Sequence, residues 1–328
     1  MNWELKNLRV EKETVSTFIK KYGTLVGLII LCLYFSLMAD RFLTVSNFIN
    51  VLTQISMLAI CAFGMSHVIL TGNIDLSVGA MVSLVGIFSA IAMASTGSTI
   101  IGLLAGLATG ILFGCLNGFL VAYVGVPAFI CTLANSSVAV GLTYMACGGQ
   151  PIYRGIPSSF TFIGQGYLLG IPMPVVILVF VLLVAHIHLT QTRRGRHLYA
   201  VGGNVEASRL SGINNKLIVL SAFAISGLMA AISGLLLTAR LGTGQPTGGS
   251  TYTLDAIAAS FLGTTAFKEG QINLPGTFLG ALIIGVLNNG LTLLNVPYFY
   301  QNVFKGLLII AAVAMNAYYR GKEGEVSM

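Results

Sequence analysis

Long apolar segments joined by short polar connections follow one another along almost the whole chain. Ten of them approach or exceed the roughly 20 apolar residues that a helix needs to cross a bilayer, although the eighth is short for a full crossing. The pattern predicts an all-α polytopic membrane protein with about ten transmembrane helices, over residues 22–39, 48–70, 76–95, 99–124, 127–147, 170–189, 217–240, 254–266, 275–294 and 298–318.

The basic polar segments define the orientation that we expect. Cytoplasmic connections are enriched in Lys and Arg, and an even number of crossings places both termini on one side. We therefore predict a cytoplasmic N-terminal arm (1–21), a transmembrane domain (22–318) with a cytoplasmic loop (190–216), and a cytoplasmic tail (319–328). These cytoplasmic parts hold twelve of the seventeen basic residues, namely Lys6, Arg9, Lys12, Lys20, Lys21, Arg193, Arg194, Arg196, Arg209, Lys216, Arg320 and Lys322.

Two connections on the other side have a different character. Residues 148–169 and 241–253 are rich in Gly, Pro, Ser and Thr and carry little charge. Such composition is typical of irregular surface loops. They are also the places where an external partner or solute could meet the protein.

Composition supports the membrane assignment and removes one class of function. The chain is 55% hydrophobic and 8% charged, whereas a soluble domain carries about a quarter charged residues. The formal net charge of +7 does not indicate nucleic-acid binding, because the basic residues lie at segment ends and not on an aromatic-interleaved face. We expect lipid, and no nucleic acid, as a partner.

A faint internal repeat suggests two related halves. Residues 114–129 and 285–299 both contain Gly-x-Leu-Asn followed by Val-Pro-x-Phe. The two copies are five crossings apart, so they would run in opposite directions through the membrane, as in many transporters. We predict two inverted, five-helix-related halves at about 48–147 and 217–318.

Glycine recurs at every fourth position of the fourth apolar segment. Residues four apart lie on one face of a helix, and a glycine face permits close approach of a neighbouring backbone. Helix packing is the expected role, and sliding of helices during a conformational change is the alternative. The glycines are Gly102, Gly106, Gly110, Gly114 and Gly118.

Polar side chains within the apolar segments are few, and each has two interpretations. Asp75 and Asp255 follow Asn73 and Thr253 by two positions, so both acids suit the first turn of a capped helix. The amides could hydrogen-bond between helices or line a path for a hydroxyl-rich solute. Both interpretations stay open for the candidate path residues Asn73, Asp75, Asn117, Asn135, Asp255, Asn288 and Asn289.

The sequence lacks the signatures of catalysis and of nucleotide binding. No GxxxxGK[ST] motif occurs, so the chain shows no P-loop of its own. The five cysteines are scattered without CxxC spacing, and we expect no metal site. We therefore expect no catalytic residue and no cofactor bound by this chain.

The basic loop contains one segment with helix signals. Asn204 suits an N-cap and Glu206 the first turn, while Gly212 suits the end of a helix. These signals predict a helix of about seven residues, 205–211, with Glu206 and Arg209 as an i, i+3 pair. So short a helix is marginal alone, so it could be a docking element or part of a solvated loop.

Four blocks resemble the permease subunits of ribose-type ABC importers, a group that also includes galactose, xylose, arabinose, allose and autoinducer-2 permeases. They read "VILTGNIDLSVGAM" (68–81), "GRHLYAVGGNVEASRLSGIN" (195–214), "QPTGGSTYTLDAIAASFLGTT" (245–265) and "GTFLGALIIGVLNNGLTLL" (276–294). The resemblance covers residues 42–315. It implies that residues 204–212 correspond to the helix that couples a permease to its ATPase, through Asn204, Glu206, Ala207, Arg209, Leu210 and Gly212.

The resemblance also implies partners and a location. These are a cytoplasmic ABC ATPase that holds ATP and Mg, a periplasmic solute-binding protein, and a second permease copy, either identical or a sister chain, in a bacterial inner (plasma) membrane. The function it implies is import of a monosaccharide, such as a ribose-like pentose or a hexose, or of autoinducer-2. An ion-coupled secondary transporter is the alternative, although it needs more intramembrane acids than this sequence has. A mere membrane anchor or receptor is a third option.

Overall fold

The computed structural model describes residues 24–264, 266, 271–307, 310 and 314. The arm (1–21), the tail (319–328) and most of the second half of the predicted tenth span lie outside the described residues. Contacts within the chain define two units. One is Ile49–Ile257, and the other combines the described residues up to Phe48 with those from Ala258 onward.

Seven helices in the described part of the chain are long and apolar enough to cross a membrane. This finding confirms an all-α polytopic membrane protein. Shorter helices, Thr24–Met38 and α11 (Tyr252–Gly263), occupy the first and eighth predicted spans. The seven are α2 (Val45–Ile69), α3 (Val78–Thr96), α4 with its π-helical extension η1 (Thr99–Val124), α5 (Ala128–Cys147), α7 (Met173–Gln191), α10 (Asn215–Leu241) and α12 (Leu274–Leu293). The inverted repeat and its boundaries stay a prediction.

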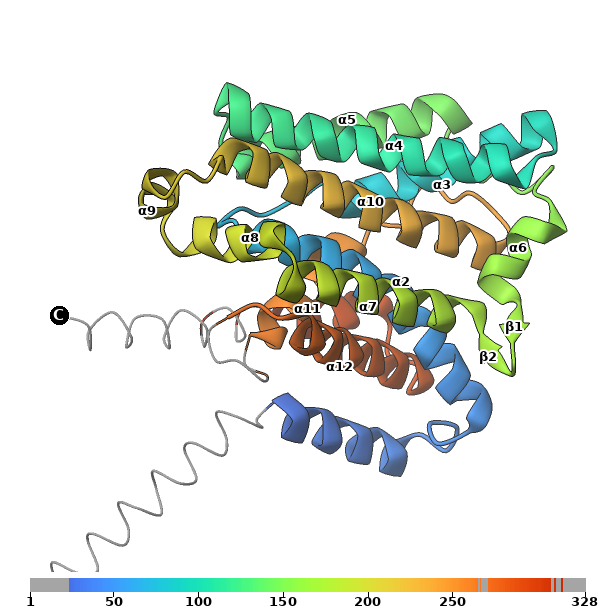
Figure 1. Ribbon diagram of the computed structural model, residues 1–328. Helices are drawn as coiled ribbons and strands as arrows, with labels where there is room; N and C mark the ends of the chain where they lie inside the picture. Colours follow the sequence, from blue (N-terminus) through green and yellow to red (C-terminus); the bar gives the residue numbers. More distant parts are fainter. Residues whose placement is uncertain (1–23, 265, 267–270, 308–309, 311–313, 315–328) are drawn as a thin grey trace, which may run out of the picture. The chain divides into compact units, whose positions relative to one another are not determined.

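Three helices, α3, α4 and α10, form the centre of the unit 49–257. Helix α10 packs along α4 and also contacts α3 (Figure 1). A buried apolar cluster joins α3 and α10 to α6 (Ser158–Gln165). Its members are Val85, Met93, Phe160, Ala231, Leu235 and Ala239.

The glycine face of α4 is the surface on which α10 packs. A Cβ added to Gly110 would lie 2.5 Å from the carbonyl oxygen of Gly227, and one added to Gly118 would lie 2.8 Å from Leu220 Cα. These distances are below any ordinary van der Waals contact, so only glycine lets the two backbones come this close. Gly106 and Gly114 also face α10, whereas Gly102 faces Met93 of α3.

The other unit has a small core of its own. Phe35, in helix Thr24–Met38, is buried against Gly290 of α12. Asn273 caps α12, because its Oδ1 accepts a 2.8 Å hydrogen bond from Gly276 N. The end of α11 packs closely on α12, where Gly280 lies against the backbone of Ala259. Small residues therefore set helix spacing in this unit too.

Two predicted loops contain regular structure. Residues 148–169, which we expected to be irregular, include α6 and the first strand, β1 (Tyr167–Leu168), of a hairpin whose second strand, β2 (Ile171–Pro172), follows the segment. Within the 190–216 loop, which we predict to be cytoplasmic, α8 (Arg193–Gly203) precedes α9 (Val205–Leu210). Only the second of these helices was predicted from the sequence. The overlooked signal for α8 is Thr192, whose Oγ1 accepts a hydrogen bond from Gly195 N.

The predicted cap before α3 is wrong. Asn73 does not begin a helix: α3 starts at Val78, and Asn73 Nδ2 donates instead to Thr71 within the preceding turn. Gly72, with φ of 78°, makes that turn, which leaves residues 73–75 outside the helix. Asp75 is therefore free to bond elsewhere. The second acid is as expected, since Asp255 lies in the first turn of α11, but the predicted cap is wrong there too. Helix α11 already begins at Tyr252, and Thr253 Oγ1 accepts a hydrogen bond from Gly79 N.

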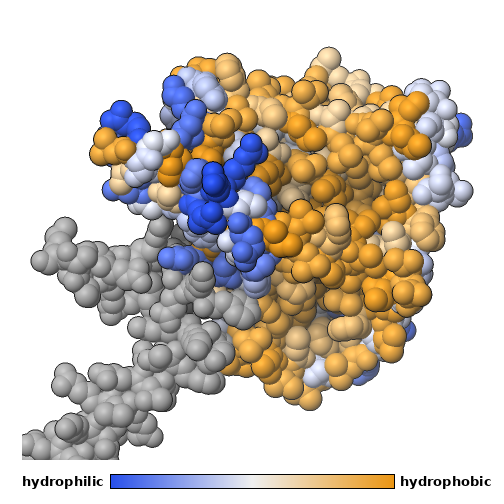
Figure 2. All heavy atoms as spheres, in the orientation of Figure 1, coloured by the Kyte–Doolittle hydropathy of each residue, from blue (hydrophilic) through white to orange (hydrophobic). Residues whose placement is uncertain are grey.

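Hydrophilic side chains gather at the ends of the helices in Figure 2. The largest visible group lies where Figure 1 places α8 and α9, and apolar side chains cover the lengths of the helices. Helices α4, α5 and α7 expose many large apolar side chains, among them Leu112, Met145 and Phe180. A water-soluble protein rarely exposes so much contiguous apolar surface, so these faces suit a bilayer.

Candidate functional site

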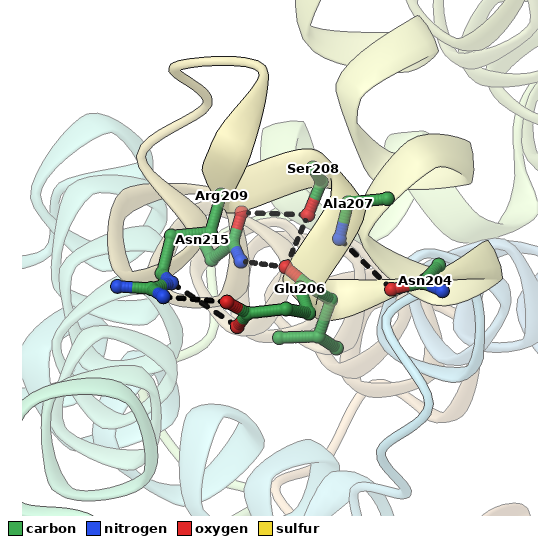
Figure 3. A network of polar contacts seen from close by, with 7 residues as sticks. Asn204, Glu206, Ala207, Ser208, Arg209 and Asn215 are labelled. Atoms are coloured by element: carbon green, nitrogen blue, oxygen red, sulfur yellow. Dashed lines mark hydrogen bonds and ion pairs between the residues drawn. The ribbon is translucent and has the colours of Figure 1, made fainter.

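Helix α9 is anchored on one side and exposed on the others. Asn204 Oδ1 accepts a 2.9 Å hydrogen bond from Ala207 N, which is the N-cap that the sequence predicts (Figure 3). Ser208 is the only buried residue of the helix. Every other residue from Val205 to Gly212 is exposed, including the apolar side chain of Leu210 at 77%. The described chain therefore leaves most of the surface of α9 uncovered.

Asn215, the first residue of α10, ties α9 to the membrane helices. Its Nδ2 donates a 2.8 Å hydrogen bond to Val205 O, and its Oδ1 accepts a 3.0 Å bond from Ser208 Oγ (Figure 3). Because an isolated helix of six residues would not be stable, these two bonds hold α9 in place. They also make α9 and the start of α10 one mechanical piece. Neither Ser208 nor Asn215 was predicted from the sequence.

The connection from α9 to α10 depends on a glycine. Gly212 has φ of 78°, and its N–H donates to Arg209 O while the next N–H, of Ile213, donates to Ser208 O. This is the Schellman arrangement, in which the left-handed residue after a helix is nearly always glycine. Asn214 then caps α10 through a 3.2 Å bond from Leu217 N. The chain is thereby turned sharply from α9 into α10.

Glu206 and Arg209 form the expected i, i+3 ion pair. Arg209 donates from Nε to Oε2 at 3.1 Å and from Nη2 to Oε1 at 2.5 Å. The Glu206 carboxylate raises the pKa of Arg209 above its ordinary value, so the guanidinium stays charged. Both side chains are about two-thirds exposed, at 63% and 67%. The pair therefore fixes a pattern of charge on the surface more than it stabilises the fold.

Three of the candidate path residues meet in one buried chain of hydrogen bonds. Asn135 Nδ2 on α5 donates to Asn117 Oδ1 on α4 at 2.5 Å. Asn117 Nδ2 donates to Ser77 Oγ at 2.8 Å, and Ser77 Oγ donates to Asp75 Oδ1 at 2.5 Å. Ser226 Oγ on α10 donates to Asp75 Oδ2 at 2.9 Å. We call Asp75, Ser77, Asn117, Asn135 and Ser226 the polar chain.

The polar chain lies inside the protein. All five side chains are buried, and Asn135 is the most accessible at 9%. Each donor meets an acceptor, which is the condition for burying such groups without a large penalty. Asp75 also receives the backbone N–H of Ser77 at 3.0 Å. The arrangement links α5, α4, the segment before α3, and α10 by direct side-chain contacts.

The remaining candidate residues have other surroundings. Asn73 bonds within its own turn, and Asp255 is buried at 3% exposure in α11. In the other unit, Asn289 and Asn47 exchange two amide hydrogen bonds, of 3.0 and 2.8 Å. Asn288 Oδ1, in contrast, is buried without a hydrogen-bond partner among the described residues. Of the seven candidate path residues, three are therefore connected through the polar chain, and the other four are not part of it.

The two Gly- and Pro-rich connections, residues 148–169 and 241–253, lie against each other. Ile152 and Gly244 exchange backbone hydrogen bonds of 2.9 and 2.8 Å. Gln165 Nε2 adds a 2.9 Å bond to Arg240 O. These contacts join residues 148–169 to the end of α10 and the segment that follows it. The two segments thus form one structured surface at the end of the helices opposite α8 and α9.

The sequence is similar to that of known transport proteins, which the geometry alone does not show. A family profile described as the permease component of a branched-chain amino acid transport system matches residues 47–313. The ribose import permease protein RbsC of Haemophilus influenzae is 40% identical over 312 residues, which cover 94% of this chain and 97% of the relative.

Two further relatives extend the comparison. RbsC of Escherichia coli K12 is 41% identical over 296 residues, covering 89% of this chain and 92% of the relative. The xylose transport system permease protein XylH of the same strain is 34% identical over 355 residues, covering 89% and 90%. No solved structure was found to match the chain.

Proposed function

The chain belongs to the family of transport-system permease components that matches its residues 47–313, and on this premise we propose that it is the membrane-spanning permease subunit of an ATP-driven, binding-protein-dependent sugar importer. The observation that carries this proposal is the near full-length similarity to proteins named as ribose import permeases. The chain is a transport subunit and not an enzyme. ATP and Mg are bound and used by a separate ATPase chain.

The solute we propose is a monosaccharide, either a ribose-like pentose or a hexose. The relatives include proteins named for ribose, allose and xylose transport. An amide suits a hydroxyl-rich solute because it both donates and accepts hydrogen bonds, and Asn288 Oδ1 has no hydrogen-bond partner among the described residues. Selection among sugars rests mainly with the external binding protein.

The proposed assembly follows from the two ends of the unit 49–257. The ATPase contacts α9 on the cytoplasmic side, where the basic residues lie, and both termini are on that side too. The loaded binding protein contacts the surface that contains Ile152 and Gly244. A second permease copy, identical or a sister chain, and the lipid of a bacterial inner membrane cover the exposed faces of the helices.

Transmission from the ATPase to the membrane passes along a defined series of contacts. Closure of the ATPases moves α9, and Asn215 carries that movement into α10 because it bonds to Val205 and Ser208. Ser226 lies about three turns further along α10 and bonds to Asp75. The polar chain then connects Asp75 to α4 and α5. Movement of α10 is thereby coupled to the helices on which Asn117 and Asn135 lie.

Reconstitution tests the function directly. The chain is placed in proteoliposomes with its ATPase inside and its sugar-loaded binding protein outside, and uptake and ATP hydrolysis are both measured. We expect uptake to require ATP and Glu206→Arg to abolish solute-stimulated hydrolysis, because the variant reverses the charge beside Arg209. Gly203→Ala is the matched control, since a Cβ there meets nothing within 4 Å.

Two outcomes would contradict the proposal. Uptake driven by a proton or sodium gradient without ATP would identify a secondary transporter. Unchanged coupling in Glu206→Arg, with a well-folded protein, would remove α9 from the mechanism.

A further inference from the structure

A β-hairpin with a leucine in its two-residue loop precedes α7. Strands β1 and β2 are joined by a loop of two residues, Leu169 and Gly170. Met173 N, at the start of α7, donates a 2.9 Å hydrogen bond to Gly166 O and so closes the base of the hairpin. The tip is therefore held at a fixed place at the end of α7 that is opposite α8.

Leu169 occupies a backbone position that disfavours it. Its φ is 51° and that of Gly170 is 82°, so both loop residues are left-handed. A two-residue loop with two positive φ values is a type I′ turn, which favours Asn-Gly or Asp-Gly. A bulky apolar residue in this conformation is uncommon and calls for an explanation. Nothing in the hairpin itself requires leucine there.

The same leucine is almost fully uncovered. Leu169 is 97% exposed, the highest value among the large apolar residues of the described chain, and three neighbours are about half exposed. Leaving these groups in water is unfavourable, in addition to the backbone strain. Both costs would be offset if the tip were buried in something outside this chain. The three neighbours are Tyr167, Leu168 and Ile171.

The length of α7 indicates what covers the tip. Its 19 residues span about 28 Å at 1.5 Å per residue, and the hydrocarbon core of a bilayer is about 30 Å thick. When α7 crosses the membrane, the hairpin at its first residue must lie at the boundary between hydrocarbon and headgroups. Helix α7 also exposes large apolar side chains along its length, among them Phe180 and Leu183.

Charge and residue type agree with that location. No charged residue occurs between Arg154 and Arg193. Tyrosine is enriched where membrane meets water, because its ring is apolar and its hydroxyl polar, and Tyr167 lies in β1. We propose that the 167–171 hairpin inserts Leu169 into the interfacial layer of the bilayer and anchors the start of α7 there. This inference does not depend on which solute is carried.

Tryptophan fluorescence can locate the tip, because Trp3 is the only tryptophan in the chain. In a Trp3→Phe background, Leu169→Trp is placed in phosphatidylcholine nanodiscs that contain acyl chains brominated at different depths. Two reference variants set the scale. Phe180→Trp, 67% exposed on α7, reports the membrane interior, and Tyr153→Trp, 66% exposed beside Arg154, reports the aqueous side.

We expect bromine near the headgroups to quench Leu169→Trp most strongly, and acrylamide to quench it several-fold less than Tyr153→Trp. Acrylamide quenching equal to that of Tyr153→Trp, with no effect of brominated lipid, would overturn the proposal. So would protection from acrylamide only after the binding protein is added, since that would assign the tip to a protein partner.

A second variant gives a readout that does not depend on tryptophan. Leu169→Asn suits the type I′ turn, so the hairpin should fold at least as well. If the tip contacts lipid, the concentration of loaded binding protein that half-saturates uptake should stay within about twofold of the parent value. A tenfold increase would place the binding protein on the tip and contradict lipid insertion. Because the fluorescence test needs no transport, its failure is distinguishable from failure of the proposed function.

Discussion

Ser226 on α10 donates a hydrogen bond of 2.9 Å to Asp75 Oδ2, although 151 positions of sequence separate the two residues. Asp75 Oδ1 is occupied by Ser77, so each oxygen of this buried carboxylate has a donor. Burying a carboxylate is costly unless its hydrogen bonds are made. The contact therefore joins α10 to the segment before α3 and closes one end of the polar chain.

Removing that donor should destabilise the protein. In Ser226→Ala, Asp75 Oδ2 stays buried without its partner, and an unsatisfied buried group costs about 1–3 kcal/mol. Ser221→Ala on the same helix is the control, because Ser221 Oγ donates its hydrogen bond within its own turn, to Ile218 O. Reversible unfolding in detergent compares the two. Equal stability of both variants would show that the Ser226 contact adds nothing.

The other end of the polar chain should matter for transport. Asn135→Ala removes the donor to Asn117 Oδ1 and disconnects α5 from α4. We expect sugar uptake per ATP hydrolysed to fall, while basal ATP hydrolysis continues. Ser137→Ala, an exposed position on α5 whose hydroxyl bonds within the helix, provides the comparison. An unchanged ratio in Asn135→Ala would limit this residue to helix packing.

Two glycine substitutions should have opposite effects. In Gly110→Ala the new Cβ would lie 2.6 Å from Ala231 Cβ, so α4 and α10 must separate, at a cost of about 1–3 kcal/mol. Gly141→Ala on α5 meets nothing within 4 Å and should stabilise its helix by about 1 kcal/mol. Thermal unfolding of purified protein measures both. Destabilisation of similar size at the two positions would mean that close packing is not the reason for Gly110.

The turn after α9 should be sensitive to a single methyl group. Gly212 is left-handed, and an L-residue there costs about 1–2 kcal/mol. Gly212→Ala should therefore loosen α9 and reduce solute-stimulated ATP hydrolysis, although the membrane helices stay folded. Gly203→Ala, which also lies in the loop but has no positive φ, should behave like the parent. Normal stimulation in Gly212→Ala would show that the turn is not needed for coupling.

The asparagine pair of the other unit offers a double-mutant cycle. Asn47→Leu and Asn289→Leu each remove both hydrogen bonds between the two amides, although Asn47 Nδ2 keeps its bond to Phe42 O in the second variant, and the double variant removes both amides. The coupling free energy between hydrogen-bonded side chains in a membrane protein averages about 0.6 kcal/mol and reaches about 1.7 kcal/mol. Because this pair makes two hydrogen bonds, we expect a value in the upper part of that range. Unfolding free energies of the four proteins give the value. A coupling of zero would mean that the pair is incidental, and changed sugar affinity would assign Asn289 to the path.

Local sequence signals predicted local structure well. Asn204, Glu206 and Gly212 gave the position of α9 within one residue, because a cap, a first-turn acid and a left-handed glycine act on the few residues around them. The prediction that Asn73 caps a helix was wrong because a local signal can be overruled by a neighbouring residue. The capping preference of Asn73 is real, but Gly72 turned the chain first, and α3 began only at Val78.

The sequence by itself determined the class of the protein, most of its helices and the helix that we propose contacts the ATPase. These follow from apolar length, from charge at segment ends and from short capping motifs, all of which depend on neighbours in the chain. Tertiary structure alone decided which polar groups meet. Ser77 and Ser226 are ordinary serines in the sequence. Ser77 joins Asp75 to Asn117 because the segment before α3 lies against α4, and Ser226 reaches Asp75 because α10 packs on the glycine face of α4. Partners for buried donors and acceptors are set by the packing of distant segments, and no local pattern specifies them.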